Sequence, residues 1–220
     1  MNTAESTPSV AVLVFGDRRV PGRLNRLPTG RADGPADSAA IDGAIGPARR
    51  LVVVGADADL AAVLSRLLRA ERLDVEVAYV PRRRTPATRV YHLPAGRRAA
   101  RRARRGTARR VPLIRDETGS VIVGGASWRP ADDGRLIHGE AIVDDTSLFD
   151  GDVAGVRIEP TLGMPGLRVR RHDAWRPWIT GRAVQLGSTG VAVVRDGVPA
   201  ARAARRSTFY RHIEGWLLVR

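Results

Sequence analysis

The sequence predicts an α/β domain over residues 9–110, followed by an all-β sandwich over residues 111–220. The first observation is a strand, a turn and a helix in one stretch. The apolar run at residues 51–54 ends at Gly55, and apolar residues then recur with the period of a helix packed on a sheet. The second is a change of pattern at Val111, where short Val- and Ile-rich runs begin to alternate with Gly, Asp and Pro about every 8–12 residues. At 220 residues, of which 43% are hydrophobic, the chain can form two small cores.

The elements of the first domain follow from apolar patterning and from the positions of Gly and Pro. Residues 9–15 form a continuous apolar run, which is typical of a buried parallel strand. Residues 16–50 contain four prolines and many Gly, Asp and Ser residues, so we expect a loop with one short helix at residues 37–44. We then expect a strand at 51–54, a helix at 60–70, a strand at 74–80 and a helix at 97–105.

The turn at residues 55–59 lies where the predicted strand gives way to the helix. Asp57 and Asp59 are candidate N-caps, because a short carboxylate accepts amide hydrogens of the first helical turn and suits the positive end of the helix dipole. In open α/β sheets, ligands bind at the carboxyl ends of the strands, where a helix N-terminus favours phosphate. The turn is therefore a candidate phosphate site, although an ordinary βα unit without a ligand explains the same residues.

The second half of the chain reads as short strands separated by turns. The acidic pairs in it are explained by turn chemistry, and the four histidines have no metal-ligand spacing, so a zinc hydrolase is not favoured. Candidate strands are residues 111–114, 120–123, 139–143, 155–159, 167–170, 181–186, 190–194 and 216–219.

The 55–59 turn, Gly-Ala-Asp-Ala-Asp, resembles the GGDGT turn of diacylglycerol kinase catalytic domains, which share an α/β plus β-sandwich fold with NAD kinases. Residues 93–96, Leu-Pro-Ala-Gly, resemble the first half of the PLGTGN motif of the same family. The resemblance implies ATP and Mg²⁺ as cofactors, with Asp57 and Asp59 as metal ligands. The implied nucleotide-binding residues are Gly55, Ala56, Asp57, Ala58, Asp59, Pro94, Ala95, Gly96 and Arg97.

The resemblance extends weakly but in the right order over residues 9–220. Residues 192–199 resemble a late strand and DGE hairpin of the sandwich, and residues 206–210 and 215–219 resemble its closing strands. Two turn glycines are alanine here, and residues 164–169, which correspond to the family's DGxLDV stretch, contain no aspartate, so the catalytic residue stays unassigned. We therefore expect weak or lost ATP-dependent phosphoryl transfer to a lipid hydroxyl. The alternative is a non-catalytic relative that binds an anionic ligand, an acidic lipid surface or a protein partner.

The formal net charge is +14, and every one of the 37 basic residues is arginine, which is typical of a bacterial genome rich in G and C. Residues 97–110 hold eight arginines; they form either a solvated helix or a helix that faces acidic lipid. Specific nucleic-acid binding is not favoured, because aromatic residues do not interleave with the arginines. With no cysteine, no secretory signal and no apolar run of membrane-spanning length, we expect a cytoplasmic protein that associates peripherally with the inner membrane face.

Overall fold

The computed structural model describes residues 10–46, 48–131, 134–172 and 177–220, and the chain divides into two compact units. Unit 1 comprises the residues up to Arg84, Leu93–Arg110 and Trp216–Arg220, and unit 2 comprises Thr85–His92 and Val111–Gly215. These units differ in two places from the expected division into residues 9–110 and 111–220. The C-terminal strand returns to the first unit, and the short segment before Leu93 belongs to the second.

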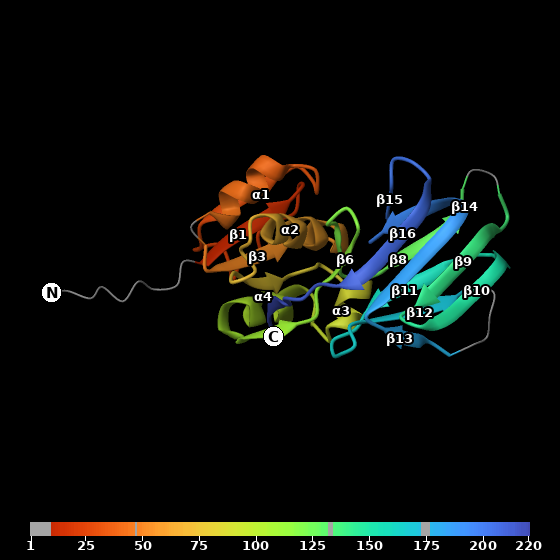
Figure 1. Ribbon diagram of the computed structural model, residues 1–220. Coiled ribbons are helices and arrows are strands. Elements are labelled where there is room, and N and C mark those ends of the chain that lie inside the picture. Colours follow the sequence, from red (N-terminus) through yellow and green to blue (C-terminus); the bar gives the residue numbers. More distant parts are fainter. Residues whose placement is uncertain (1–9, 47, 132–133, 173–176) are drawn as a thin grey trace. The chain divides into compact units, whose positions relative to one another are not determined.

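Unit 1 is a six-stranded sheet with helices on both faces (Figure 1). The strand order is β2-β1-β3-β4-β17-β5, and β1 pairs in parallel with β2 and β3, as β4 does with β3 and β17. Its elements are β1 (Val10–Phe15), β2 (Thr29–Ala32), α1 (Ser38–Ile45), β3 (Arg50–Val54), α2 (Asp57–Arg69), β4 (Glu76–Tyr79), α4 (Gly96–Arg105), β5 (Ala108–Val111) and β17 (Trp216–Val219).

Alternation of side chains across the strands creates the two faces of this sheet. Val52, Val54 and Ala78 share one face, where they pack with the alanines of α4 in a single apolar cluster. The helices α1 and α2 cover the opposite face (Figure 1). The predicted strand at 51–54, the helix that follows it and the short helix near residues 37–44 are all present, which confirms an α/β domain.

The strand β2 was not anticipated, because residues 16–50 were expected to contain only loop and one helix. Its four residues are Thr-Gly-Arg-Ala, and three of them are exposed. It pairs only with β1, so it is an edge strand that buries almost no side-chain surface and carries no apolar alternation. The expected strand at residues 9–15 is observed as Val10–Phe15, and Ser9 lies outside the described residues.

Unit 2 is an eleven-stranded, antiparallel β structure around its own apolar core. The predicted all-β sandwich is thus confirmed. Its elements are α3 (Pro86–Val90), β6 (Ile114–Asp116), β7 (Val121–Ile122), β8 (Ala126–Pro130), β9 (Ile137–Val143), β10 (Thr146–Val153), β11 (Val156–Pro160), β12 (Leu167–Arg171), β13 (Ile179–Gly181), β14 (Ala183–Arg195), β15 (Val198–Pro199) and β16 (Ala204–Arg211).

The long strand β14 organises unit 2, where the sequence predicted two separate strands at 181–186 and 190–194. Its first part pairs with β9, from Val184 to Ser188, and its second part pairs with β8, from Val191 to Arg195. The strand exchanges β9 for β8 as its partner near Gly190 without ending, so one continuous strand connects β9 and β8 (Figure 1). The glycines and serine between the apolar runs mark this change of partner and not a turn.

Two further expectations about strands are corrected. Residues 216–219 were expected to close the sandwich, but β17 pairs with β4 of unit 1 through Leu217 and Leu218. The expected strand at 111–114 is two strands, because β5 ends at Val111 in the six-stranded sheet and β6 begins at Ile114 in the sandwich. A short apolar run has the pattern of a buried strand in either sheet, so the pattern does not select the partner.

Candidate functional site

The 55–59 turn connects β3 to α2 at the carboxyl edge of the unit 1 sheet. The helix begins at Asp57, and its N-cap is Ala56, not Asp57 or Asp59 as predicted. Alanine has no side-chain oxygen to offer the helix. Instead Asp59, in the first turn, reaches back, and its Oδ2 accepts the backbone N–H of Ala56 at 2.7 Å. A carboxylate of the chain itself therefore sits at the N-terminus of α2.

Gly55 makes this arrangement possible. A Cβ atom added at Gly55 would lie 2.6 Å from Oδ2 and 2.8 Å from Cβ of Asp59, well inside van der Waals contact. The absence of a side chain at Gly55 thus permits a close approach between its backbone and the first turn of α2. In this chain, the space beside that backbone is filled by the Asp59 side chain.

We expect Gly55→Ala to lower the free energy of unfolding by about 1–3 kcal/mol, because the new methyl group forces the Asp59 side chain out of place. Gly43→Ala is the matched control: Gly43 lies inside α1, and a Cβ there would meet no atom within 4 Å. The control should be neutral or stabilising by about 0.5–1 kcal/mol. Urea unfolding followed by circular dichroism measures both, and equal effects would show that Gly55 has no special role.

Asp59 is buried, with 5% of its surface exposed, and Nη1 of Arg18 lies 3.6 Å from its Oδ2. Burial raises the pKa of Asp59, and the hydrogen bond from Ala56 and the charge of Arg18 offset only part of this increase. A second anion at this position would be placed against a carboxylate. The electrostatics of the turn therefore oppose a bound phosphate.

Asp57 is also buried, and its Oδ1 accepts a hydrogen bond from the Tyr79 hydroxyl at 2.8 Å. Tyr79 is the last residue of β4, which pairs with β3 in parallel, so this bond joins the ends of two neighbouring strands. Sequence reasoning missed Tyr79. The signal available for it was its position: parallel strands place their carboxyl ends at one edge, so a polar residue ending β4 falls beside the 55–59 turn.

The arrangement of Asp57 and Asp59 does not fit a magnesium site. Magnesium takes oxygen ligands in near-ideal octahedral geometry. Here the Asp57 carboxylate accepts a hydrogen bond from a tyrosine hydroxyl, and the Asp59 carboxylate accepts one from a backbone amide and lies beside an arginine. Across residues 10–46, 48–131, 134–172 and 177–220, no group of three or more His, Asp or Glu side chains is placed to hold a metal ion.

The other implied nucleotide-binding residues, Pro94 to Arg97, lie at the same edge of the sheet. The backbone N–H of Gly96 donates to the carbonyl of Pro81 at 2.8 Å, and Pro81 follows directly after β4. The helix α4 begins at Gly96, which has a φ of 60°, after the N-cap Ala95. Because β3 and β4 are parallel neighbours, the two turns lie at the carboxyl ends of adjacent strands.

The helix α4 packs on the sheet through alanines alone. Ala99, Ala100 and Ala103 are buried, and they join the apolar cluster of the sheet. Its C-terminal end is held by Arg50, whose guanidinium donates to the carbonyls of Ala103 at 3.1 Å and Gly106 at 3.0 Å. Arg50 is fixed in turn by an ion pair with Glu76 at 2.6 Å. These contacts hold α4 firmly against the sheet.

The outward side of α4 consists of arginine. A Cβ at Gly96 would lie 3.6 Å from the carbonyl oxygen of Arg82, so the arginines after β4 lie beside the start of the helix. We name this group of exposed residues the arginine surface. It consists of Arg82, Arg83, Arg84, Arg97, Arg98, Arg101, Arg102, Arg104 and Arg105.

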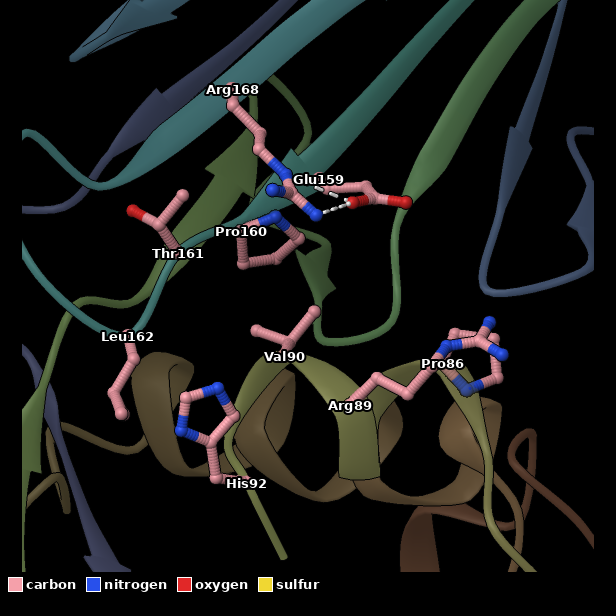
Figure 2. A pocket seen from close by; sticks show the side chains of 9 residues that line it. All are labelled: Pro86, Arg89, Val90, His92, Glu159, Pro160, Thr161, Leu162 and Arg168. Atoms are coloured by element: carbon pink, nitrogen blue, oxygen red, sulfur yellow. Dashed lines mark hydrogen bonds and ion pairs between the residues drawn. The ribbon is translucent and has the colours of Figure 1, made fainter. Parts of the chain in front are cut away.

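Unit 2 contains a pocket of about 340 Å³ between α3 and the hairpin formed by β11 and β12 (Figure 2). Glu159 of β11 lies in its wall and is 8% exposed. Its carboxylate accepts hydrogen bonds from Arg157 at 2.6 Å and from Arg168 of β12 at 2.6 Å. Sequence reasoning identified neither Glu159 nor this pocket, because the helix α3 in its other wall was not predicted.

The chemistry of Glu159 is set by its two arginine partners. Burial by itself raises the pKa of Glu159, but the hydrogen bonds and charges of Arg157 and Arg168 outweigh burial, so the pKa is lowered. A carboxylate held ionised by two guanidinium groups is a weak proton acceptor. Arg168 lies within the stretch 164–169 that resembles the family motif, so the charge at this part of the sandwich is positive where the family has an acid.

Comparison with known proteins finds the fold but no sequence family. No family model matches the chain, and no curated protein does. A diacylglycerol kinase from Bacillus anthracis str. Sterne is similar in structure, with a TM-score of 0.71, 8% identity and 96% of each chain covered.

Two nicotinamide-nucleotide kinases are similar as well. An NAD kinase from Archaeoglobus fulgidus, solved in complex with ATP, matches with a TM-score of 0.65 and 12% identity over 96% of this chain and 93% of that one. Yeast NADH kinase, complexed with NADH, matches with a TM-score of 0.61 and 8% identity over 98% and 84%. The chain thus has the fold shared by diacylglycerol kinases and NAD kinases.

Proposed function

We propose that this kinase-fold protein binds the surface of acidic lipid membranes through the arginine surface, and that its phosphoryl-transfer activity is absent or very weak. The observation that carries the proposal is α4, which buries a stripe of three alanines and presents six exposed arginines. Such a helix contributes little apolar area to the core, so its composition is better explained by what its outer side binds.

Charge complementarity supports a membrane as the partner. Residues 97–110 contain no acidic residue, so neighbouring arginines there repel one another in the absence of an anionic partner. Each arginine near an anionic bilayer contributes about 1 kcal/mol of attraction, and this attraction falls off within a Debye length of about 8–10 Å. Several arginines on one rigid helix therefore give strong but salt-sensitive binding. Among the described residues, no helix is long and apolar enough to span a bilayer, so the proposed attachment is peripheral.

The geometry of the 55–59 turn supports the second part of the proposal. The ATP-binding role expected for this turn requires room and positive potential beside the N-terminus of α2. Asp59 occupies that position with its own carboxylate, and Ala56 and Ala58 add methyl groups at positions where the family has glycine. A protein that retains the fold but fills its own phosphate position is better suited to binding a surface than to transferring phosphate.

Co-sedimentation with vesicles tests the membrane proposal. The full chain is expected to sediment with phosphatidylglycerol vesicles at low salt, to be released at high salt, and not to sediment with neutral phosphatidylcholine vesicles. Replacing Arg101, Arg102, Arg104 and Arg105 by alanine should abolish binding, and alanine preserves the helix because it has the highest helix propensity.

A matched variant separates the arginine surface from overall charge. Replacing Arg135, Arg202, Arg205 and Arg206 by alanine removes the same four charges from exposed positions of unit 2. This variant should keep most of the vesicle binding. Equal losses in the two variants, or binding that does not respond to salt, would mean that the arginine surface is not a membrane site.

A further inference from the structure

The unit 2 pocket has an apolar part and a basic part. The apolar lining residues are Val90 of α3 and Pro160 and Leu162 of the hairpin, and Figure 2 shows Val90 pointing from the helix towards Pro160. Arg89, His92 and Arg168 lie around them. At about 340 Å³, the pocket is at the small end of ligand sites in proteins.

The charges around the pocket do not cancel. Arg157 and Arg168 share the single carboxylate of Glu159, and Arg89 adds a third guanidinium. Arg89 has no side-chain partner within the part of the chain that the structure describes, so its charge is uncompensated there. The cluster therefore carries an excess of two positive charges beside an apolar wall.

Arg168 is held in place before any ligand binds. Its Nε and Nη2 donate to Oε2 of Glu159 at 3.0 and 2.6 Å, and its guanidinium lies 4.4 Å from the ring centroid of Trp178. These contacts fix the plane of the guanidinium, and its Nη1 has no partner among the described residues. A guanidinium fixed by stacking and by an ion pair loses little freedom when it takes up another acceptor.

We propose that the pocket binds a small phosphomonoester whose phosphate lies on Arg89 and Arg168 and whose apolar part lies on Val90, Pro160 and Leu162. A phosphomonoester carries about −1.5 to −2 charges at pH 7, which matches the excess positive charge better than a carboxylate does. Arginine forms bidentate hydrogen bonds with phosphate oxygens. The pocket is formed by residues that do not belong to the arginine surface, so this proposal does not depend on the membrane proposal.

Titration calorimetry on the full chain with phenyl phosphate as the probe tests the site. Phenyl phosphate is expected to bind, whereas benzyl alcohol, which has the ring without the charge, should not. Inorganic phosphate should bind about tenfold more weakly than phenyl phosphate, because it lacks the group that lies on the apolar wall. Equal affinity for phenyl phosphate and inorganic phosphate would overturn the apolar half of the proposal.

Two variants and a control locate the binding. Arg89→Gln should weaken phenyl phosphate binding by about tenfold or more, since it removes a charged donor without disturbing the Glu159 cluster. Leu162→Asn should weaken phenyl phosphate but leave inorganic phosphate unchanged. Arg202→Gln, at an exposed position elsewhere in unit 2, should have no effect. Equal weakening by Arg89→Gln and Arg202→Gln would assign the binding to diffuse charge and reject the pocket.

A phosphomonoester can come from a lipid head group or from a free metabolite, and soluble dihexanoyl phosphatidic acid distinguishes the two. Tighter binding of dihexanoyl phosphatidic acid than of phenyl phosphate would assign the pocket to a lipid head group, and the reverse order would assign it to a free phosphomonoester. Failure of both probes to bind at millimolar concentration would overturn the proposal.

Discussion

Replacing Asp116 by alanine is expected to lower the free energy of unfolding by about 3–5 kcal/mol, the usual cost of removing one partner from a buried ion pair. Asp116 ends β6 and is fully buried. Its Oδ1 accepts the backbone N–H groups of Thr118 and Ser120, both at 2.9 Å, and its Oδ2 accepts Nε of Arg195. Alanine would leave the guanidinium of Arg195, whose side chain is only 19% exposed, without this carboxylate.

Two further variants test whether the loss of stability comes from the charge of Asp116. Asp116→Asn keeps an oxygen for the backbone amides but loses the charge opposite Arg195, so we expect a smaller loss than with alanine. Asp145→Ala is the control, because Asp145 is an exposed acid in a turn of the same unit and should change stability by less than about 0.5 kcal/mol. If urea unfolding gave similar values for Asp116→Ala and Asp145→Ala, the buried network would contribute nothing to stability.

The parts of the fold that could be predicted are those fixed by local pattern. The apolar run at 51–54 and the helical period after it specify β3 and α2, because both signals extend over several consecutive residues. Several strands of the sandwich were located for the same reason, but β8 and β10 were not among the candidates. In contrast, β17 shows that sheet membership is decided by a partner far away in sequence, which a four-residue apolar run cannot reveal.

The short helix α3 was missed although its sequence carries a start signal. Thr85 caps the helix, with its Oγ1 accepting the N–H of Thr88 at 3.2 Å, and Pro86 occupies the first helical position. The arginines at 82–84 and the following Tyr91 and His92 obscured this five-residue element. Because α3 forms one wall of the unit 2 pocket, missing it meant missing the pocket.

The residues of the 55–59 turn were correctly located at the sheet edge, but their chemistry was not predictable. The sequence around Asp57 and Asp59 indicates that both lie in a turn, but it does not indicate their partners. Tyr79 of β4 contacts Asp57, and Arg18 of the loop after β1 contacts Asp59. Those partners decide whether a carboxylate is free to hold a metal ion. The nucleotide role of residues 55–59 and 94–97 therefore stays a hypothesis that kinetics must test.

Lipid kinase activity is expected to be absent or very weak in the natural protein, and restoring the turn glycines is not expected to rescue it. Ala56→Gly/Ala58→Gly removes two methyl groups, but Asp59 still fills the N-terminus of α2 with its carboxylate. Adding Asp59→Thr removes that carboxylate, so the triple variant should bind ATP more tightly than the natural protein. It should still lack turnover, because the sandwich stretch 164–169 supplies arginine and no acid.

The missing acid makes this a large effect, since losing a general base typically lowers a rate by about 10²–10⁴-fold. The measurement is ATP turnover with mixed diacylglycerols in micelles, alongside ATP binding by calorimetry, for the natural protein and both turn variants. Tighter ATP binding without turnover in the triple variant would place the defect in two separate parts, the phosphate turn and the acceptor side. Robust turnover by the natural protein would show that Asp57, Glu159 or another carboxylate suffices as the base, and the non-catalytic proposal would then have to be abandoned.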